Sequence, residues 1–225
     1  MELGNGFPID LILFGMIAVF LVLRLRSILG RRTGFERQAP PVQPPRPAKP
    51  PIIEGRAEPP PAPAAPPASR SLPPPGSPAG QVLMQMRQFD PSFDPNRFLA
   101  GADQAFRMIV AAFASGDRTA LRPLLSGETY RAFDQAITDR DRAGETQVSE
   151  IRSIQHLGID DAALQGPIGT VTARIVSDQV SYTKDRDGRL LTGTDAVTEI
   201  TDIWTFERDL SQQDPSWRLV AARSG

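Results

Sequence analysis

Residues 94–116 read DPNRFLAGADQAFRMIVAAFASG, and this stretch decides the fold of the carboxyl-terminal part of the chain. Asp94 followed by Pro95 is a strong helix start, because the carboxylate caps the first turn and proline fits the first helical position. Apolar side chains then recur at the helical period as far as Gly116: Phe98, Leu99, Ala102, Phe106, Ile109, Val110 and Phe113. The stretch predicts an amphipathic helix over 96–115 that buries one face.

The residues after Gly116 predict two further helices, each with its own capping residue. Asp117 caps a short helix through Leu121, and Ser126 caps a third helix that runs into the charged sequence TDRDRAGE. The apolar residues of the third helix are Tyr130, Phe133 and Ile137. Three helices in succession are therefore expected before the first strand.

Beyond Gly144 the sequence changes to β-branched residues in alternation, which predicts four antiparallel strands at 148–159, 170–182, 197–208 and 217–223. In the second strand the apolar positions switch parity between Ile175 and Val176, which predicts a bulge or a sharp bend at that point. In the last strand, one face is expected to carry Trp217, Leu219 and Ala221. Helices followed by an antiparallel sheet indicate an α+β fold, in which three helices pack on a curved four-stranded sheet to form a cone.

The amino-terminal stretch 11–23, LILFGMIAVFLVL, contains no charged residue. With its apolar flanks it reaches about 19 residues, close to the roughly 20 that span a bilayer. It lacks the positive segment and the small-residue cleavage site of a secretory signal, and no neighbouring segment would cover it as a buried helix of a soluble fold. We therefore interpret 1–37 as a single transmembrane anchor with a basic juxtamembrane segment.

All the basic residues near this span follow it: Arg24, Arg26, Arg31, Arg32 and Arg37. Because basic residues next to a span are retained in the cytoplasm, the carboxyl-terminal domain is expected to be cytoplasmic and the amino terminus to lie on the opposite side. Each arginine contributes about 1 kcal/mol against an anionic lipid surface. The first four are therefore candidates for contact with lipid phosphate.

Residues 38–89 are predicted to form a disordered, proline-rich linker. Of the 23 prolines in the chain, 17 lie between Pro40 and Pro78. Such a composition buries too little apolar surface to offset the entropy of ordering, and repeated proline favours polyproline II. The folded domain is then expected to occupy 90–225 at the end of a stiff tether. A less favoured interpretation of PPRPAKP, within the linker, is a ligand for a proline-recognising domain.

Composition and charge exclude several classes of protein. The chain has no cysteine, which excludes disulfides, thiolate metal sites and cysteine nucleophiles, and its only histidine is His156. Residues 81–225 carry 16 basic and 21 acidic residues, so the folded part lacks the basic footprint of a nucleic-acid-binding domain. No metal site, cofactor or nucleic-acid partner is predicted.

Two stretches of the folded part resemble the Tim44-like domain family. The first is FDPNRFLAGADQAFRMIVAAFASGDRTALRPLLSGETYRAF at 93–133, and the second is ITDIWTFERDLSQQDPSWRLVA at 200–221, with W-x-F-x-R followed by D-P-x-W-x-L. The opening span followed by RLRSILGRRTGFE also resembles the alphaproteobacterial members of this family.

The resemblance implies a nuclear transport factor 2-like cone on an inner-membrane adaptor, and hence a bacterial inner membrane with the amino terminus in the periplasm. The partners it implies are membrane lipids and membrane or translocation proteins. A chaperone partner carries over only weakly, because the chain lacks the long charged amino-terminal region of the mitochondrial members.

Two sets of residues are candidates for a binding site. Seven aromatic residues fill the core or line a pocket for an apolar peptide or a lipid tail: Phe106, Phe113, Tyr130, Phe133, Trp204, Phe206 and Trp217. Arg118 and Arg122, at i and i+4, either form a solvated helix face or meet lipid phosphate.

No catalytic residue is assigned. Enzymes of the isomerase type that share this cone use a carboxylate base inside an apolar cavity, and no inward-facing aspartate stands out in the predicted strands. The leading hypothesis is a non-enzymatic adaptor on the cytoplasmic face of the inner membrane, in protein translocation or membrane-protein biogenesis. The alternatives are a secretion-system scaffold with its domain in the periplasm, and an isomerase-type enzyme.

Overall fold

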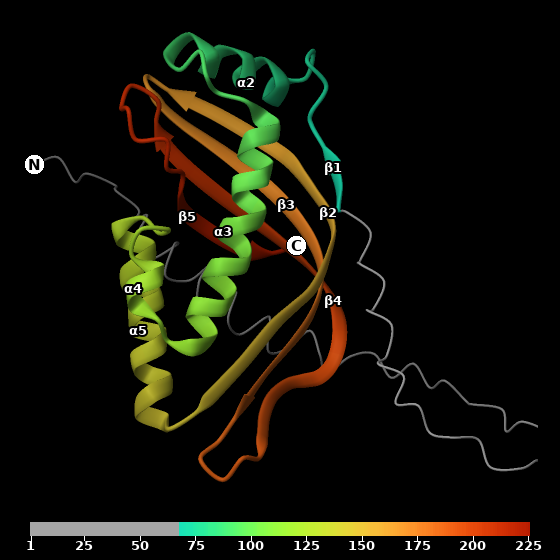
Figure 1. The fold of residues 1–225 in the computed structure, drawn as a ribbon, viewed down its shortest axis with the longest axis vertical. Coiled ribbons are helices and arrows are strands. Elements are labelled where there is room, and N and C mark those ends of the chain that lie inside the picture. The colour runs from blue at the N-terminus through green and yellow to red at the C-terminus, as the bar shows by residue number, and fades with distance from the viewer. Residues whose placement is uncertain (1–67) are drawn as a thin grey trace, which may run out of the picture.

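A computed structural model describes residues 68–225, in which a long helix packs against one face of a curved sheet (Figure 1). In chain order the elements are β1 (Ser69–Ser71), α2 (Pro78–Phe89), α3 (Pro95–Ser115), α4 (Arg118–Leu121), α5 (Gly127–Ala143), β2 (Thr146–Gln165), β3 (Ile168–Lys184), β4 (Leu190–Asp209) and β5 (Arg218–Ser224). The predicted anchor at 11–23 and its arginines lie outside the described residues. No helix between residues 68 and 225 has both the length and the apolarity needed to cross a membrane.

The three helices predicted between residues 94 and 143 are confirmed, together with their caps. The Asp94 carboxylate accepts hydrogen bonds from the Asn96 and Arg97 amides, at 2.7 and 3.3 Å, so α3 begins where the Asp-Pro step predicts. Gly116 ends α3 in the left-handed conformation, with φ of 72°, which a residue with a side chain adopts only at a cost. At the start of α4 and α5, the side chains of Asp117 and Ser126 accept hydrogen bonds from backbone amides of the first turn, as Asp94 does in α3.

The sheet has five strands, in the order β1-β2-β3-β4-β5, and not the four strands predicted. β1 runs parallel to β2, and the other neighbours are antiparallel, so the sheet is mixed. β1 escapes prediction because it is only three residues long and shows no alternation of its own. His156 of β2 fixes it, since the two ring nitrogens lie 2.9 Å from the Ser69 hydroxyl and 3.2 Å from the Ser71 hydroxyl.

Three irregularities in the register curve β2 around the helices. Each of them places one extra residue of β2 opposite β3, between Ile151 and Ser153, between Ile154 and His156, and between Ile159 and Asp161. The inward-facing apolar residues of β2 are consequently spaced by three where a bulge intervenes: Ile151, Ile154, Leu157, Ile159 and Ala162. Bulges bend the strand and increase its twist, so they produce the concave face that holds α3.

The bulge predicted between Ile175 and Val176 is wrong in its position. Alternating burial in β3 continues through Gln179, and the register to β4 shifts between Gln179 and Ser181. The inner face accepts the polar side chains of Ser177 and Gln179 because they bond to each other, at 2.9 Å. Ala221 is likewise not on the buried face, because a shift opposite Thr205 and Phe206 of β4 places Leu219 and Ala222 inward.

The prediction of a linker as far as residue 89 is wrong at its carboxyl-terminal end, where α2 packs on β2. Ser77 caps α2 through a 3.1 Å hydrogen bond from the Gly80 amide, and Pro78 occupies the first turn. Ala79, Leu83 and Met86 follow at i, i+4 and i+7 and are buried. The high proline content upstream conceals this helix, although Ser-Pro is itself a helix-start signal.

The burial of α2 predicts the effect of two matched substitutions in one helix. Met86→Ala should lower the free energy of unfolding by about 2–5 kcal/mol, because Met86 is 0% exposed and its loss leaves a cavity. Met84→Ala should change it by less than about 0.5 kcal/mol, because Met84 is 61% exposed. Urea denaturation followed by tryptophan fluorescence measures both values, and equal effects would show that α2 is not part of the folded unit.

Candidate functional site

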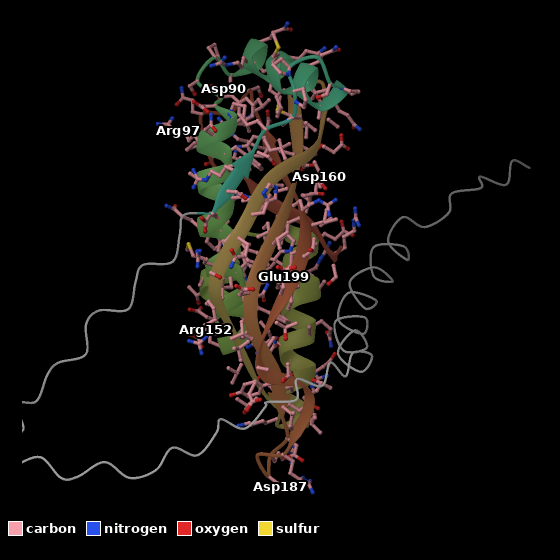
Figure 2. All side chains as sticks on the ribbon, turned by 90° about the vertical axis from the view of Figure 1, so that its right-hand side faces the viewer. Asp90, Arg97, Arg152, Asp160, Asp187 and Glu199 are labelled. Carbon is pink, nitrogen blue, oxygen red and sulfur yellow. The ribbon has the colours of Figure 1, made fainter. Side chains whose placement is uncertain are left out.

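A pocket of about 390 Å³ opens at the end of the sheet next to α2. The connection between α2 and α3, one face of α3, the residues after α4, the end of β4 and the β4–β5 loop all contribute to its wall. Figure 2 shows two of its lining residues, Asp90 and Arg97, at the upper end of the molecule, far from Asp187 at the tip of the β3–β4 turn. The site is therefore built from segments distant in the sequence.

Aromatic rings form much of the pocket wall. The ring of Trp217 lies 5.0 Å from that of Phe98 and 5.9 Å from that of Phe93, measured between centroids. Phe206 meets Phe98 edge to face at 5.9 Å, with the planes inclined by 80°. Such tilted and edge-to-face pairs stabilise one another by about 0.5–1.5 kcal/mol beyond their burial. The pocket is therefore apolar and shaped before anything binds to it.

Arg208 ties the two loops of the pocket together. Its Nη1 atom lies 2.9 Å from Oδ2 of Asp90, which ends α2, and its Nε donates to the Asp214 carbonyl oxygen at 3.0 Å in the β4–β5 loop. The Arg208 and Asp90 side chains are only 10% and 12% exposed. A pair this well shielded depends on both partners, because loss of one leaves an uncompensated charge.

The pKa of Asp90 is lowered below its ordinary value of 3.8. The main cause is the hydrogen bond that the Ser92 hydroxyl donates to Oδ1, at 2.6 Å, and the Ser92 amide and Arg208 act in the same direction. Burial opposes the shift. The carboxylate is consequently charged whenever the pocket is intact near neutral pH.

A glycine opens the α3 side of the pocket. A Cβ atom built at Gly101 would have no neighbour within 4 Å, and Gly101 is one of the lining residues. A glycine inside a helix costs about 1 kcal/mol relative to alanine. Its missing side chain leaves room beside the aromatic wall, so this position controls how much of the pocket is free.

The seven aromatic candidates divide among three places. Phe206 and Trp217 line the pocket. Phe106 of α3 and Trp204 of β4 are buried between the helix and the sheet and meet edge to face at 4.8 Å, so they belong to the core. The other three are half-buried side chains of α3 and α5: Phe113 and Phe133, whose rings lie 4.9 Å apart, and Tyr130.

The two arginine candidates of α4 have different surroundings. Arg118 contacts two carboxylates of α5, at 2.6 Å to Asp134 and 3.3 Å to Asp141, and these bonds raise its pKa. Arg122 lies over the ring of Tyr130, 4.5 Å from its centroid. The charge of Arg118 is thus already matched within the domain. Arg24, Arg26, Arg31 and Arg32 lie outside the described residues.

Sequence reasoning missed the polar part of the pocket and one inward-facing carboxylate. The role of Arg208 depends on Asp90, more than a hundred residues away, and no local pattern signals such a pair. Asp202 shares the inner side of β4 with Trp204 and is 3% exposed, so the expectation that no inward aspartate stands out is wrong. The sequence carries a signal for this position, because Asp202 is two residues before Trp204 and therefore lies on the same face of the strand. Gln179 donates to its carboxylate at 3.0 Å, and Asp202 does not line the pocket.

No group of three or more histidine, aspartate or glutamate side chains among residues 68–225 has the arrangement of a metal site.

The fold and the pocket define the class: an α+β domain in which a curved sheet wraps a long helix and an aromatic pocket opens at one end. The Tim44-like domain model matches residues 79–224. The chain belongs to this family.

Two relatives show the same likeness over the folded part. The chain is 27% identical over 146 residues to the mitochondrial import inner membrane translocase subunit TIM44 of Rattus norvegicus, covering 62% of this chain and 32% of that protein. It is 25% identical over 141 residues to the large ribosomal subunit protein mL45 of Drosophila melanogaster, covering 61% and 39%. The chain thus matches only about a third of the length of each relative.

Solved structures with a similar outline are more distant. The intermembrane space region of the chloroplast protein ARC6 matches with a TM-score of 0.43 and 13% identity, over 60% of this chain and 98% of that one. A nuclear transport factor 2-like protein from Salmonella enterica matches with a TM-score of 0.39 and 11% identity, over 59% and 92%. At these scores, neither likeness says anything about activity.

The lowered pKa of Asp90 predicts how its replacement depends on pH. Asp90→Asn should reduce the free energy of unfolding by about 1–3 kcal/mol at neutral pH, because the charged acceptor of Ser92 and Arg208 is lost. A carboxylate whose pKa is lowered by folding stabilises the protein fully at pH values above its pKa in the unfolded state, which is about 3.8. This stabilisation is lost as the pH falls through the pKa of the folded state. The difference between the two proteins should therefore narrow below that pH.

Urea denaturation over a series of pH values measures this difference. Glu207→Gln serves as the control, because Glu207 is exposed and lies on the strand that carries Arg208, and it should change the stability by less than about 0.5 kcal/mol. A difference that stays constant down to strongly acidic pH would show that the charge of Asp90 does not hold the two loops together.

Proposed function

We propose that this protein is a non-enzymatic, membrane-anchored adaptor whose pocket holds an apolar segment of a partner protein. The observation that carries the proposal is the pre-formed aromatic pocket, whose two loops are joined by Arg208 and Asp90. A rigid apolar cavity with few polar groups favours an aromatic or aliphatic side chain, since burial of such a group contributes about 1.5–3 kcal/mol. An anchor side chain in a pocket is a common centre for a protein interface.

The exposed face of α3 extends the surface around the pocket. Arg97, Gly101, Gln104 and Met108 are exposed, lie at i, i+4, i+7 and i+11, and line the pocket opening. Met108 is an exposed, adaptable apolar side chain, and Gly101 permits a close approach to the helix. A partner segment inserted in the pocket would therefore continue along α3.

Family membership supports the choice of process. The rat relative is by name a subunit of a mitochondrial import translocase of the inner membrane. Protein translocation or membrane-protein biogenesis is accordingly the process that we propose, with membrane or translocation proteins as partners. A chaperone is a weaker candidate.

The proposed location follows from the sequence before the domain. An uncharged stretch at 11–23 followed by Arg24, Arg26, Arg31 and Arg32 suits a single-pass anchor in a bacterial inner membrane, with the arginines against lipid phosphate. The amino terminus would then be periplasmic and the domain cytoplasmic. A secretion-system scaffold with its domain in the periplasm is the alternative that reverses this orientation.

An isomerase-type enzyme is the less favoured alternative. Such chemistry requires a carboxylate base that substrate can reach inside an apolar cavity. Asp202 faces the inside of the sheet, but it is buried, accepts a hydrogen bond from Gln179 and does not line the pocket. The carboxylate that does line the pocket and is shielded, Asp90, is paired with Arg208 and has a lowered pKa, which weakens it as a base.

Two substitutions of Gly101 test the pocket. Gly101→Phe should place a ring in the open space of the pocket and reduce capture of a partner by at least about tenfold. Gly101→Ala should keep the capture, while raising helix stability by about 1 kcal/mol. Capture is measured in native membranes with a photocrosslinker at Gln104, on the pocket rim, followed by mass spectrometry.

Three results would contradict the proposal that the pocket holds a protein segment. Equal capture by both would exclude the pocket as the partner site. If the crosslinked products contain only lipid, the occupant of the pocket is an acyl chain and not a segment of a partner protein. Turnover of a small molecule that Asp202→Asn abolishes would favour the isomerase.

The absence of native cysteine makes the membrane orientation directly testable. Gln213→Cys introduces a single thiol in the exposed β4–β5 loop. If the domain is cytoplasmic, a membrane-impermeant maleimide should label it only after the inner membrane is opened. Labelling after the outer membrane alone is permeabilised would instead support the periplasmic scaffold.

A further inference from the structure

The β4 strand has an unpaired edge over more than half of its length. β5 pairs with β4 only across residues 202–207, whereas β4 begins at Leu190. Among the strands of residues 68–225, no other lies along this edge, and the Gly225 amide donates to the Thr201 carbonyl oxygen at 2.9 Å. Residues 190–200 consequently present backbone donors and acceptors on the side away from β3, as an exposed template for another strand.

The side chains of this segment combine exposed apolar groups with negative charge. Leu190, Leu191 and Val197 are 54%, 48% and 57% exposed, which makes this the strand with the most exposed large aliphatic side chains among the described residues. Asp195 and Glu199 are exposed as well, and residues 190–201 contain no lysine, arginine or histidine. The edge is therefore apolar and acidic at once.

The backbone of β4 limits how a strand can dock there. Asp195, Ala196 and Val197 lie opposite the single residue Val180, because Gln179 pairs with Thr198 and Ser181 pairs with Thr194. Bulges of this kind discourage indiscriminate pairing along an edge. Regular pairing is available only in the two short stretches on either side of the bulge, which favours a short extended segment.

We propose that this edge of β4 binds a short extended segment of a partner protein that carries an apolar and a basic residue on the same face. Backbone hydrogen bonds to the edge supply the docking, as in other cases of strand addition. A lysine or arginine of the incoming segment meets Glu199 in the regular stretch after the bulge, and an apolar side chain of the same segment packs beside the exposed Val197. Cross-strand pairs of opposite charge stabilise such an arrangement, and like charges destabilise it.

The same edge of a second copy of this chain lacks the positive charge that would complement it. Antiparallel pairing of two copies about Val197 would bring Asp195 of one protomer opposite Glu199 of the other. Two such contacts in one interface are repulsive, and no cation of residues 190–201 offsets them. Charge complementarity therefore selects a basic partner segment over self-association.

The edge is separate from the aromatic pocket. Figure 1 shows the β3–β4 turn at the end of the sheet opposite α2, and the pocket lies at the α2 end. In Figure 2, Glu199 lies on the sheet between Asp160 above and Asp187 at the lower tip. The proposal for β4 therefore stands even if the pocket binds nothing.

Binding of a short peptide with valine and lysine two positions apart, as in Val-Thr-Lys-Thr, to the full-length protein tests the proposal, because both side chains then lie on one face of the strand. Fluorescence anisotropy should show saturable binding, with amide exchange slowed at residues 190–200 and unchanged around Gly101. A peptide with the same side chains but methylated backbone nitrogens on its pairing edge should not bind. The joint variant Asp195→Lys with Glu199→Lys should weaken binding about tenfold, because it removes the ion pair to Glu199 and replaces both carboxylates of the edge by cations.

Glu207→Lys is the matched control, because Glu207 is exposed on the same strand but is paired with Arg218 of β5. It should leave the affinity within about twofold of the unsubstituted protein, since screening weakens charges beyond about 8–10 Å. Equal weakening by Glu207→Lys, or equal binding of the methylated peptide, would overturn the proposal in favour of attraction by overall charge. A dimer in sedimentation that the Asp195→Lys and Glu199→Lys variant abolishes would assign the edge to a second copy instead.

Discussion

The packing of α3 into the concave face of the sheet is the contact on which the other features depend. Phe106 of α3 meets Trp204 of β4 edge to face, and both are buried. This contact requires a sheet that curves towards the helix, and the three extra residues in β2 supply the curvature. With a flat sheet, the ends of β4 and α3 would diverge, and the rings of Phe98 and Phe206 would not meet at the pocket.

The concave face changes in character along its length. At the α2 end it is aromatic and leads into the pocket, where Arg208 matches its charge with Asp90. Towards the β3–β4 turn it becomes polar, and there the Gln179 side-chain amide donates to both Ser177 and Asp202. Buried polar groups tolerate fewer arrangements than apolar ones, because each donor and acceptor must keep its partner. The polar end therefore restricts the register of β3 and β4, whereas the aromatic end leaves space for a ligand.

The helices α3, α4 and α5 could be predicted because their signals are local. Asp94, Gly116 and Ser126 each act within one turn of their own helix, so the sequence states where α3 and α5 begin or end. β1 depends instead on His156, more than eighty residues away, and therefore leaves no local signal. The bulges of β2 change which residues face inward, so alternation alone misplaces its inner face. The aromatic character of the site could be inferred, but its polar link could not, because Arg208 and Asp90 meet only in the folded protein.

The two exposed surfaces have different physical origins, which bears on how an adaptor can use them. The pocket is formed by side chains and is shaped in advance, so the partner that we propose for it would be selected by volume and apolarity. The edge of β4 is formed by backbone, and the selectivity that we propose for it comes from Val197, Glu199 and the bulge. Because one lies at the α2 end and the other towards the β3–β4 turn, a partner at one surface leaves the other accessible. If both proposals hold, the domain would bind two extended or apolar segments at once, and the separation of the two surfaces along the sheet would set the distance between the segments.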